Sequence, residues 1–177
     1  LAKCAQTECL KKTLELMPHG DVNGKSLGVA MEDEVSGLLT LAFSMLTVDA
    51  SGLEGQFDSR VPVCGNEENM LKVVKEQMAA KGLTLHNDSM IPPHMVDGES
   101  LFVKTLLRVY EEYTGKEGKC LSIGGGTYVH NLKNGVAFGA SMPETDNRMH
   151  GADEFAVVEE LVTSAKMFAQ VIVDLCS

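Results

Sequence analysis

Two segments with alternating side chains, joined by a short turn, constrain the fold of this chain most. The first covers residues 38–48 and the second residues 53–61, with the turn residues 49–52 (DASG) between them. The apolar side chains at every second position of the first segment are Leu39, Leu41, Phe43 and Met45. A period of two is typical of a strand with one buried face. The sequence therefore predicts an antiparallel hairpin with one apolar and one polar face.

Helical patterns lie on both sides of this hairpin. Residues 3–17 predict a short helix, and a second helix is predicted from Asn66, a favourable N-cap residue, to Gly82. Further short strands are predicted within residues 24–37 and 83–87. This first part of the chain is therefore expected to form a small antiparallel α+β layer.

Pro92-Pro93 marks the clearest internal boundary. A helix is predicted from about Ser100 to Gly115, and a long amphipathic helix over residues 154–175. Between them we expect two short strands and a polar loop, at residues 119–132, 135–140 and 143–154. The apolar stripe of the long helix comprises Val158, Leu161, Ala165, Phe168, Ile172 and Leu175.

Charge and hydropathy exclude two classes of partner. The chain has 15 Lys and Arg against 25 Asp and Glu, a net charge of −10, and its basic residues do not cluster. Nucleic-acid binding depends on clustered basic side chains, so we exclude it. No run of about 18 apolar residues occurs, so we expect no membrane partner. The five cysteines lack Cys-x-x-Cys spacing, which favours reduced thiols and a cytoplasmic location over a zinc knuckle.

A run of three glycines, Gly124 to Gly126, follows a predicted strand. Bare backbone permits either a sharp turn or the close approach of a ligand, and its amides can donate to an anion. The run has neither the spacing of a P-loop nor that of a dinucleotide-binding fingerprint. The spacing alone leaves both a structural turn and an anion-binding loop open.

Arg60 and His150 are the side chains most suited to specific chemistry. Arg60 lies on the polar face of its strand, and a guanidinium suits bidentate binding of a carboxylate. The alternative is a surface ion pair with Asp58 or Glu54. His150 lies in a polar loop flanked by carboxylates, which suits a metal ligand, although an exposed loop histidine is the simpler interpretation.

Several motifs in sequence together resemble a known family. SIGGGTY at 122–128, NGVAFGA at 134–140 and MHGADEF at 149–155 follow one another with short gaps, and KSLGVAMEDEVSGLLTLAFSML, FDSRVPV and SLFVKTLLRVYEEYTGKEG precede them. These segments resemble the PepV-like dipeptidases. That family belongs to the dinuclear zinc exopeptidases, with carnosinase, acetylornithine deacetylase and succinyl-diaminopimelate desuccinylase. The resemblance covers nearly the whole chain, and the pairing of GGGTY with MHGADE is its most specific part.

The resemblance implies a catalytic α/β domain with an inserted lid domain. Residues 1–96 then correspond to the second part of the lid, and residues 97–177 to the C-terminal segment of the catalytic domain. Arg60 matches the lid arginine that binds the free carboxylate of the substrate. Gly126 matches a glycine-loop position whose backbone helps to hold the substrate, and His150 matches a zinc-ligand histidine.

The resemblance further implies hydrolysis of dipeptides, with two zinc ions in the complete enzyme and manganese or cobalt as alternative ions. In this family the other metal ligands and the general-base glutamate precede the lid. We therefore assign no catalytic residue to this chain and expect the 177 residues alone to be inactive. Its expected partners are a dipeptide substrate and the missing N-terminal half of the same protein, and an uncovered apolar face is also expected to favour self-association.

The sequence departs from the family pattern at one point, and two other functions remain as alternatives. Val129-His130 stands where the family often has a small residue followed by arginine, which affects the contact that this arginine makes. The chain could instead be a non-catalytic binding or oligomerisation module that retains the lid fold. A phosphate-binding domain at residues 124–127 is a further alternative, although no helix begins directly after the glycines.

Overall fold

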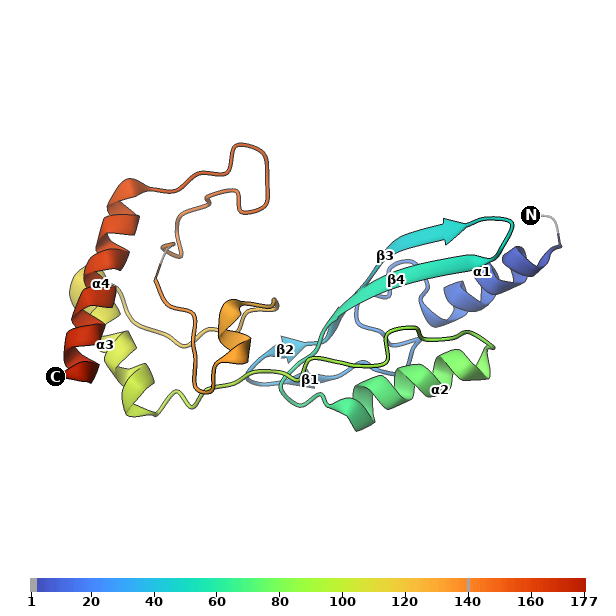
Figure 1. Ribbon diagram of the computed structural model, residues 1–177, viewed down its shortest axis with the longest axis horizontal. Helices are drawn as coiled ribbons and strands as arrows, with labels where there is room; N and C mark the ends of the chain where they lie inside the picture. Colours follow the sequence, from blue (N-terminus) through green and yellow to red (C-terminus); the bar gives the residue numbers. More distant parts are fainter. Residues whose placement is uncertain (1–2, 140) are drawn as a thin grey trace. The chain divides into compact units, whose positions relative to one another are not determined.

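The computed structural model describes residues 3–139 and 141–177 (Figure 1). The chain divides into two compact units, one formed by Leu1–His94 and Ser122–Gly125 and the other by Met95–Leu121 and Gly126–Ser177. The elements of the described residues are, in order, α1 (Ala5–Leu16), β1 (Glu32–Asp33), β2 (Gly37–Leu38), β3 (Thr40–Val48), β4 (Leu53–Arg60), a π-helical turn η1 (Glu67–Leu71), α2 (Lys72–Ala80), α3 (Leu101–Thr114), a 3₁₀ turn η2 (Tyr128–Asn131) and α4 (Val158–Cys176). Helices and small antiparallel sheets together confirm the α+β class.

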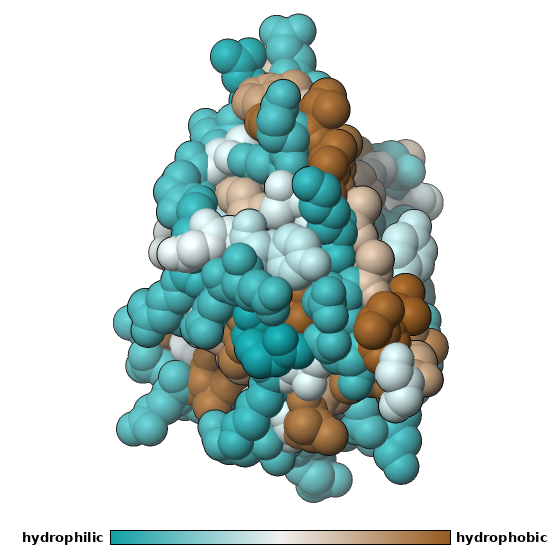
Figure 2. Space-filling view, turned by 90° about the vertical axis from the view of Figure 1, so that its left-hand side faces the viewer, coloured by the Kyte–Doolittle hydropathy of each residue, from teal (hydrophilic) through white to brown (hydrophobic). Residues whose placement is uncertain are grey.

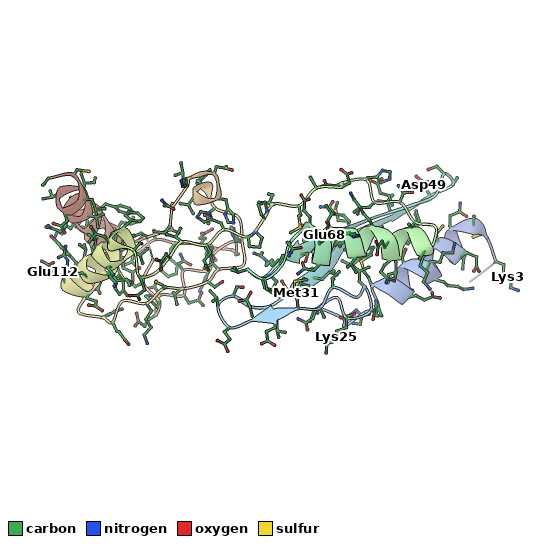
Figure 3. The ribbon with its side chains drawn as sticks, turned by 90° about the horizontal axis from the view of Figure 1, so that it is seen from below. Lys3, Lys25, Met31, Asp49, Glu68 and Glu112 are labelled. Atoms are coloured by element: carbon green, nitrogen blue, oxygen red, sulfur yellow. The ribbon has the colours of Figure 1, made fainter. Side chains whose placement is uncertain are left out.

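The predicted hairpin is the main sheet of the first unit. β3 pairs with β4 in antiparallel register, from Thr40 opposite Arg60 to Val48 opposite Leu53. Asp49, labelled in Figure 3, holds the turn, because its carboxylate accepts the backbone N–H groups of Ser51 at 2.7 Å and Gly52 at 3.1 Å. The turn chemistry visible in the sequence is therefore what joins the two strands.

A β-bulge half-way along β3 changes which side chains of that strand point towards the core. The register moves from Phe43 opposite Phe57 to Met45 opposite Gln56, which leaves Ser44 as an extra residue. An extra residue reverses the alternation of side chains beyond it. Leu41 is buried, whereas Met45 is 60% exposed, so the prediction that the two share one buried face is wrong beyond Phe43.

The core of the first unit lies among α1, α2, the hairpin and the turns that precede it. Its buried apolar residues are Leu16, Met17, Leu27, Val29, Leu39, Leu41, Met70 and Val74. Asn66 caps the second helix as predicted, since its side chain accepts the backbone N–H groups of Glu68 at 2.9 Å and Asn69 at 3.1 Å. Figure 3 labels Glu68 at this end of the helix. Gly82 follows the helix with φ at +69°, a left-handed conformation that suits glycine.

Four predicted strands are absent or much shorter among the described residues. Residues 83–87 are irregular, because Leu83 and Leu85 pack against the core as single side chains and no neighbouring strand pairs with them. Only the two-residue β1 and the start of β2 form within 24–37, where Gly24 and Gly28 have positive φ. Residues 119–132 contain η2 in place of a strand, and 135–139 are irregular; residue 140 lies outside the described residues.

The second unit is built around the packing of α3 against α4. Ser100 caps α3 by accepting the N–H of Val103 at 3.3 Å, and Gly115 ends it with φ at +69°. Both ends match the prediction. The core residues of this unit are Leu106, Val109, Met142, Met167 and Val171, with Phe102, Tyr110, Val136 and Phe138 packed against them.

Helix α4 begins four residues later than predicted and buries a different face. Its buried residues are Ser164, Met167 and Val171. The apolar stripe indicated by the sequence is exposed, for example at Phe168, which is 45% exposed, and Ile172, which is 61% exposed. Figure 2 shows several groups of hydrophobic side chains among hydrophilic ones on one face of the molecule. None of the helices in the described part of the chain has the length and apolar character needed to span a bilayer.

Candidate functional site

Arg60 ends β4 and is the charged group around which the candidate site is built. It lies opposite Thr40 at the end of the hairpin and is exposed. No other residue in the described ranges makes a hydrogen bond or an ion pair with its guanidinium, and nearby Asp58 instead accepts a hydrogen bond from Ser44 at 3.0 Å. The alternative of a surface ion pair with Asp58 or Glu54 is therefore not what the described residues form. All five N–H donors of Arg60 are left available to a ligand.

The glycine run lies directly against Arg60. A Cβ atom placed on Gly124 would lie 2.9 Å from Cδ of Arg60, and one placed on Gly125 would lie 3.0 Å from Nη1. Neither glycine has a positive φ. Positions 124 and 125 therefore favour glycine because the Arg60 side chain lies close to the backbone there. The backbone conformation itself does not require glycine.

A cavity of about 230 Å³ opens beside the guanidinium. Residues from three segments of the first unit line it: Ser36, Leu38, Thr40, Arg60, Val61, Pro62, Ser122, Ile123 and Gly124. Arg60 is the only charged residue in this lining. The cavity thus combines one cation with hydroxyl groups and apolar side chains, a composition that suits a small anionic ligand.

Asp33 ties the turn after Arg60 to the β1–β2 segment. Its carboxylate accepts the backbone N–H groups of Ser36 at 2.6 Å and Cys64 at 3.0 Å, and the hydroxyl of Ser36 accepts the N–H of Val63 at 2.8 Å. These backbone donors, that of Ser36 first, lower the pKa of Asp33 well below its ordinary value. Hydrogen bonds to the β1–β2 segment therefore fix the backbone that follows β4 at Val63 and Cys64, three and four residues after Arg60.

Gly126 lies in the second unit, unlike Gly124 and Gly125. It is exposed, and apart from its own atoms and those of its chain neighbours no described atom lies within 4 Å of the position that its Cβ would occupy. Its expected role in holding the substrate stays a prediction. The glycines that the structure brings to Arg60 are Gly124 and Gly125.

His150 lies in an exposed loop with unusual backbone angles. Three non-glycine residues within six positions have a positive φ: Arg148 at 56°, His150 at 64° and Asp153 at 56°. Such conformations cost free energy and persist where the surroundings hold them. The backbone N–H of His150 donates a hydrogen bond to the Glu154 carboxylate at 3.3 Å, and the role of its imidazole as a metal ligand stays a prediction.

The described residues do not by themselves fit a zinc site. A zinc site needs three or four protein ligands, and within 3–139 and 141–177 no three or more His, Cys, Asp or Glu side chains lie close enough together to hold a metal ion. The role of His150 as a metal ligand therefore stays a prediction that the described residues do not complete.

His130, which replaces the arginine common in the resembling family, has a structural contact. Its Nδ1 accepts the backbone N–H of Thr127 at 3.2 Å. An accepting Nδ1 places the ring hydrogen of a neutral imidazole on Nε2. The side chain therefore helps to close the turn that follows the glycine run.

Sequence reasoning found Arg60 and the glycine run but missed two features of this site. It did not place Gly124 and Gly125, rather than Gly126, against Arg60. It also missed Asp33 and Ser36, whose only sequence signal is an aspartate followed three residues later by a serine and then by glycine, a pattern typical of a turn.

Comparisons with known proteins return dipeptidases. The chain is 38% identical over 157 residues to "Putative dipeptidase YtjP" of Bacillus subtilis (strain 168), covering 88% of the chain and 33% of that protein. It is 35% identical over 158 residues to "Beta-Ala-Xaa dipeptidase" of Lactobacillus delbrueckii subsp. lactis, covering 89% and 33%. The chain thus spans about a third of the length of these relatives. No family model matches the chain.

Proposed function

We propose that this chain is part of a zinc-dependent dipeptidase that hydrolyses short peptides with a free C-terminal carboxylate. The similarity to dipeptidases over 88% of the chain supports a peptidase hydrolase. The resemblance of the GGGTY and MHGADE motifs to PepV-like dipeptidases supports the finer assignment.

The observation that supports this proposal most directly is the environment of Arg60. Its guanidinium has no partner among the described residues, lies against the bare backbone of Gly124 and Gly125, and faces a cavity. A planar guanidinium binds a carboxylate through two parallel hydrogen bonds. Arg60 would therefore hold the C-terminal carboxylate of the substrate and fix the distance from that end to the peptide bond. A fixed end favours short substrates, because it limits the length of peptide that fits.

The metal site is proposed to require residues outside this chain. Within that proposal His150 contributes one ligand, and the chain alone is inactive. Zinc is the expected ion, with manganese or cobalt as alternatives.

The exposed apolar face of α4 supports a partner for the second unit. Its exposed large apolar residues are Val158, Leu161, Val162, Phe168, Ile172, Val173 and Leu175. A helix that is apolar on most of its surface is typically buried on all sides. We propose that the remaining part of the same polypeptide covers this face, and that the isolated chain self-associates through it.

Hydrolysis by the complete reading frame tests the proposed function. We expect the complete protein to hydrolyse dipeptides and the 177-residue chain to be inactive. Amidation of the substrate's C-terminus removes the charge that Arg60 binds. The amidated dipeptide should therefore lose most of kcat/KM.

An Arg60→Gln variant separates this role from a structural one. We expect it to lose activity on the free acid and to discriminate little between free and amidated dipeptides, because the selective contact is gone. Lys11→Gln, which removes an exposed cation elsewhere in the first unit, is the matched control. Equal rates on free and amidated dipeptides with the unmodified protein would overturn the assignment of Arg60.

A non-catalytic binding module is the second candidate. Arg60, Gly124, Gly125 and the cavity all lie in one unit, so a small carboxylate could bind without the other unit. A complete protein that binds dipeptides but leaves them intact, with metal supplied, would favour this candidate.

A further inference from the structure

The cavity beside Arg60 contains apolar surface that carboxylate binding does not use. Its apolar lining consists of Leu38, Val61, Pro62 and Ile123. Leu38 is 56% exposed and Ile123 is 61% exposed. Covering such surface with an apolar ligand group is favourable, because it removes apolar area from water. The cavity therefore has the chemistry to select what is attached to the carboxylate.

We propose that this cavity receives the apolar side chain of the C-terminal residue of a short peptide, while Arg60 binds the carboxylate of that residue. The inference rests on the proposed function, since it takes Arg60 as the carboxylate site. It adds a specificity pocket and names the residues that form it.

The geometry of an amino acid supports this placement. The carboxylate and the side chain of a residue are attached to the same Cα, so a carboxylate held by Arg60 brings the side chain to a neighbouring position. Arg60 itself lines the cavity, so the place proposed for the carboxylate and the place proposed for the side chain adjoin each other. The volume of about 230 Å³ lies below the roughly 300–1,000 Å³ of pockets that enclose drug-sized ligands, and therefore suits one side chain.

The charge of the lining supports an apolar occupant. Among the described residues that line the cavity, Arg60 is the only charged one, and it is engaged by the carboxylate in this proposal. A charged side chain placed among Leu38, Val61 and Ile123 would lose its hydration without gaining an opposite charge. Apolar C-terminal residues should therefore bind better than glycine, and acidic or basic ones should not.

Ligand binding by the 177-residue chain tests the pocket without requiring hydrolysis. The probes are N-acetylglycine, N-acetylleucine and N-acetylaspartate, titrated against the isotope-labelled chain by NMR. We expect N-acetylleucine to bind about tenfold or more tightly than N-acetylglycine, the range found when a few methylene groups enter an apolar pocket. N-acetylaspartate should show no such gain.

Two lining residues can be changed with little risk to the fold, since both are more than half exposed. Leu38→Ala and Ile123→Ala should each reduce the ratio of leucine to glycine affinity. Val35→Ala is the matched control, because Val35 lies in the same unit, is 64% exposed and does not line the cavity. That variant should keep the ratio of the unmodified chain.

The outcomes distinguish this inference from the proposed function. Equal affinities for the leucine and glycine probes, or an unchanged ratio in both lining variants, would overturn the pocket. Failure of all three probes to bind would overturn both the pocket and the carboxylate role of Arg60. A leucine preference in the chain, together with no hydrolysis by the complete protein, would keep the pocket and overturn only the dipeptidase proposal.

Discussion

At the scale of single residues, Gly124 determines where the Arg60 side chain can lie. We predict that Gly124→Ala weakens binding of N-acetylleucine to the chain by about tenfold to a hundredfold, the effect of displacing a binding group by about 1 Å. The physical reason is that the new Cβ would lie 2.9 Å from Cδ of Arg60, which must move because it is the more flexible partner. NMR titration measures the affinity.

The matched control for this prediction is Gly52→Ala. Gly52 lies in the same unit, has no positive φ, and no atom lies within 4 Å of its Cβ position. The Gly52→Ala variant should bind N-acetylleucine with the affinity of the unmodified chain. Unchanged affinity in Gly124→Ala would show that Arg60 is not positioned by the glycine backbone.

Asp33 gives the first unit a dependence on acid. Its pKa in the folded chain lies below the ordinary value of 3.8, because backbone N–H groups stabilise its charged form. The stabilisation is therefore complete above about pH 4 and is lost as the pH falls from there towards the pKa of the folded state. We predict that Asp33→Asn lowers Tm at pH 7 and flattens this acid-dependent part of the Tm profile.

Thermal unfolding from pH 7 to pH 2.5 measures the contribution of Asp33. Asp88→Asn is a suitable control, because Asp88 is an exposed carboxylate in the same unit that forms an ion pair with Lys75 at 3.3 Å. Parallel Tm profiles for the unmodified chain and Asp33→Asn would contradict the role of Asp33.

Residue-level features were predictable from sequence only where a local pattern determines them. Arg60 could be placed on the polar face of a strand because strand alternation and the turn at Asp49 are local. The importance of Asp33 could not be predicted, because Cys64, which donates to Asp33, and Val63, which donates to Ser36, lie about 30 residues further along the chain. Gly124 and Gly125 were recognised as bare backbone, but the side chain that approaches them is set by tertiary packing.

At the scale of elements, α4 has two apolar faces and buries one of them. We predict that Met167→Ala destabilises the second unit by about 2–5 kcal/mol, the usual cost of truncating a fully buried large side chain. Met167 is 0% exposed, whereas Ile172 is 61% exposed. In a dilute, monomeric sample, Ile172→Ala should therefore change the free energy of unfolding by no more than about 0.5 kcal/mol. Urea unfolding followed by circular dichroism compares the two.

The Ile172→Ala variant also tests how the exposed face behaves in solution. A larger loss for Ile172→Ala that grows with protein concentration would support the self-association proposed for this face. A loss that does not depend on concentration would contradict the exposure of Ile172 itself.

Helix ends and the hairpin were predictable because their signals are local. Asn66, Ser100 and Gly115 each lie where capping rules place them. The buried face of α4 was not predictable, because its sequence contains two apolar stripes and only packing against α3 selects Met167 and Val171. The segment at 83–87 alternates like a strand, but a strand also needs a neighbour to pair with, and sequence does not supply one.

At the scale of the whole molecule, the residues that the structure describes contain a candidate carboxylate site but no group of side chains that could hold a metal ion. The Arg60 cavity lies within one unit. His150 is a lone candidate ligand, and no group of three ligating residues exists among the residues that the structure describes. The chain spans about a third of the length of its relatives, so the proposed metal site is expected to take its other ligands from the rest of the protein.

Metal content tests this division of the site. We predict that the 177-residue chain, purified without chelators and dialysed, retains much less than one zinc per chain, because one imidazole cannot hold the ion. The complete reading frame should retain about two, the number implied by the resembling family. A His150→Ala variant of the complete protein should then lose metal, whereas His86→Ala, a histidine of the other unit, should not. Stoichiometric zinc in the isolated chain that survives His150→Ala would mean that ligands other than His150 bind it, and the assignment of this loop would be wrong.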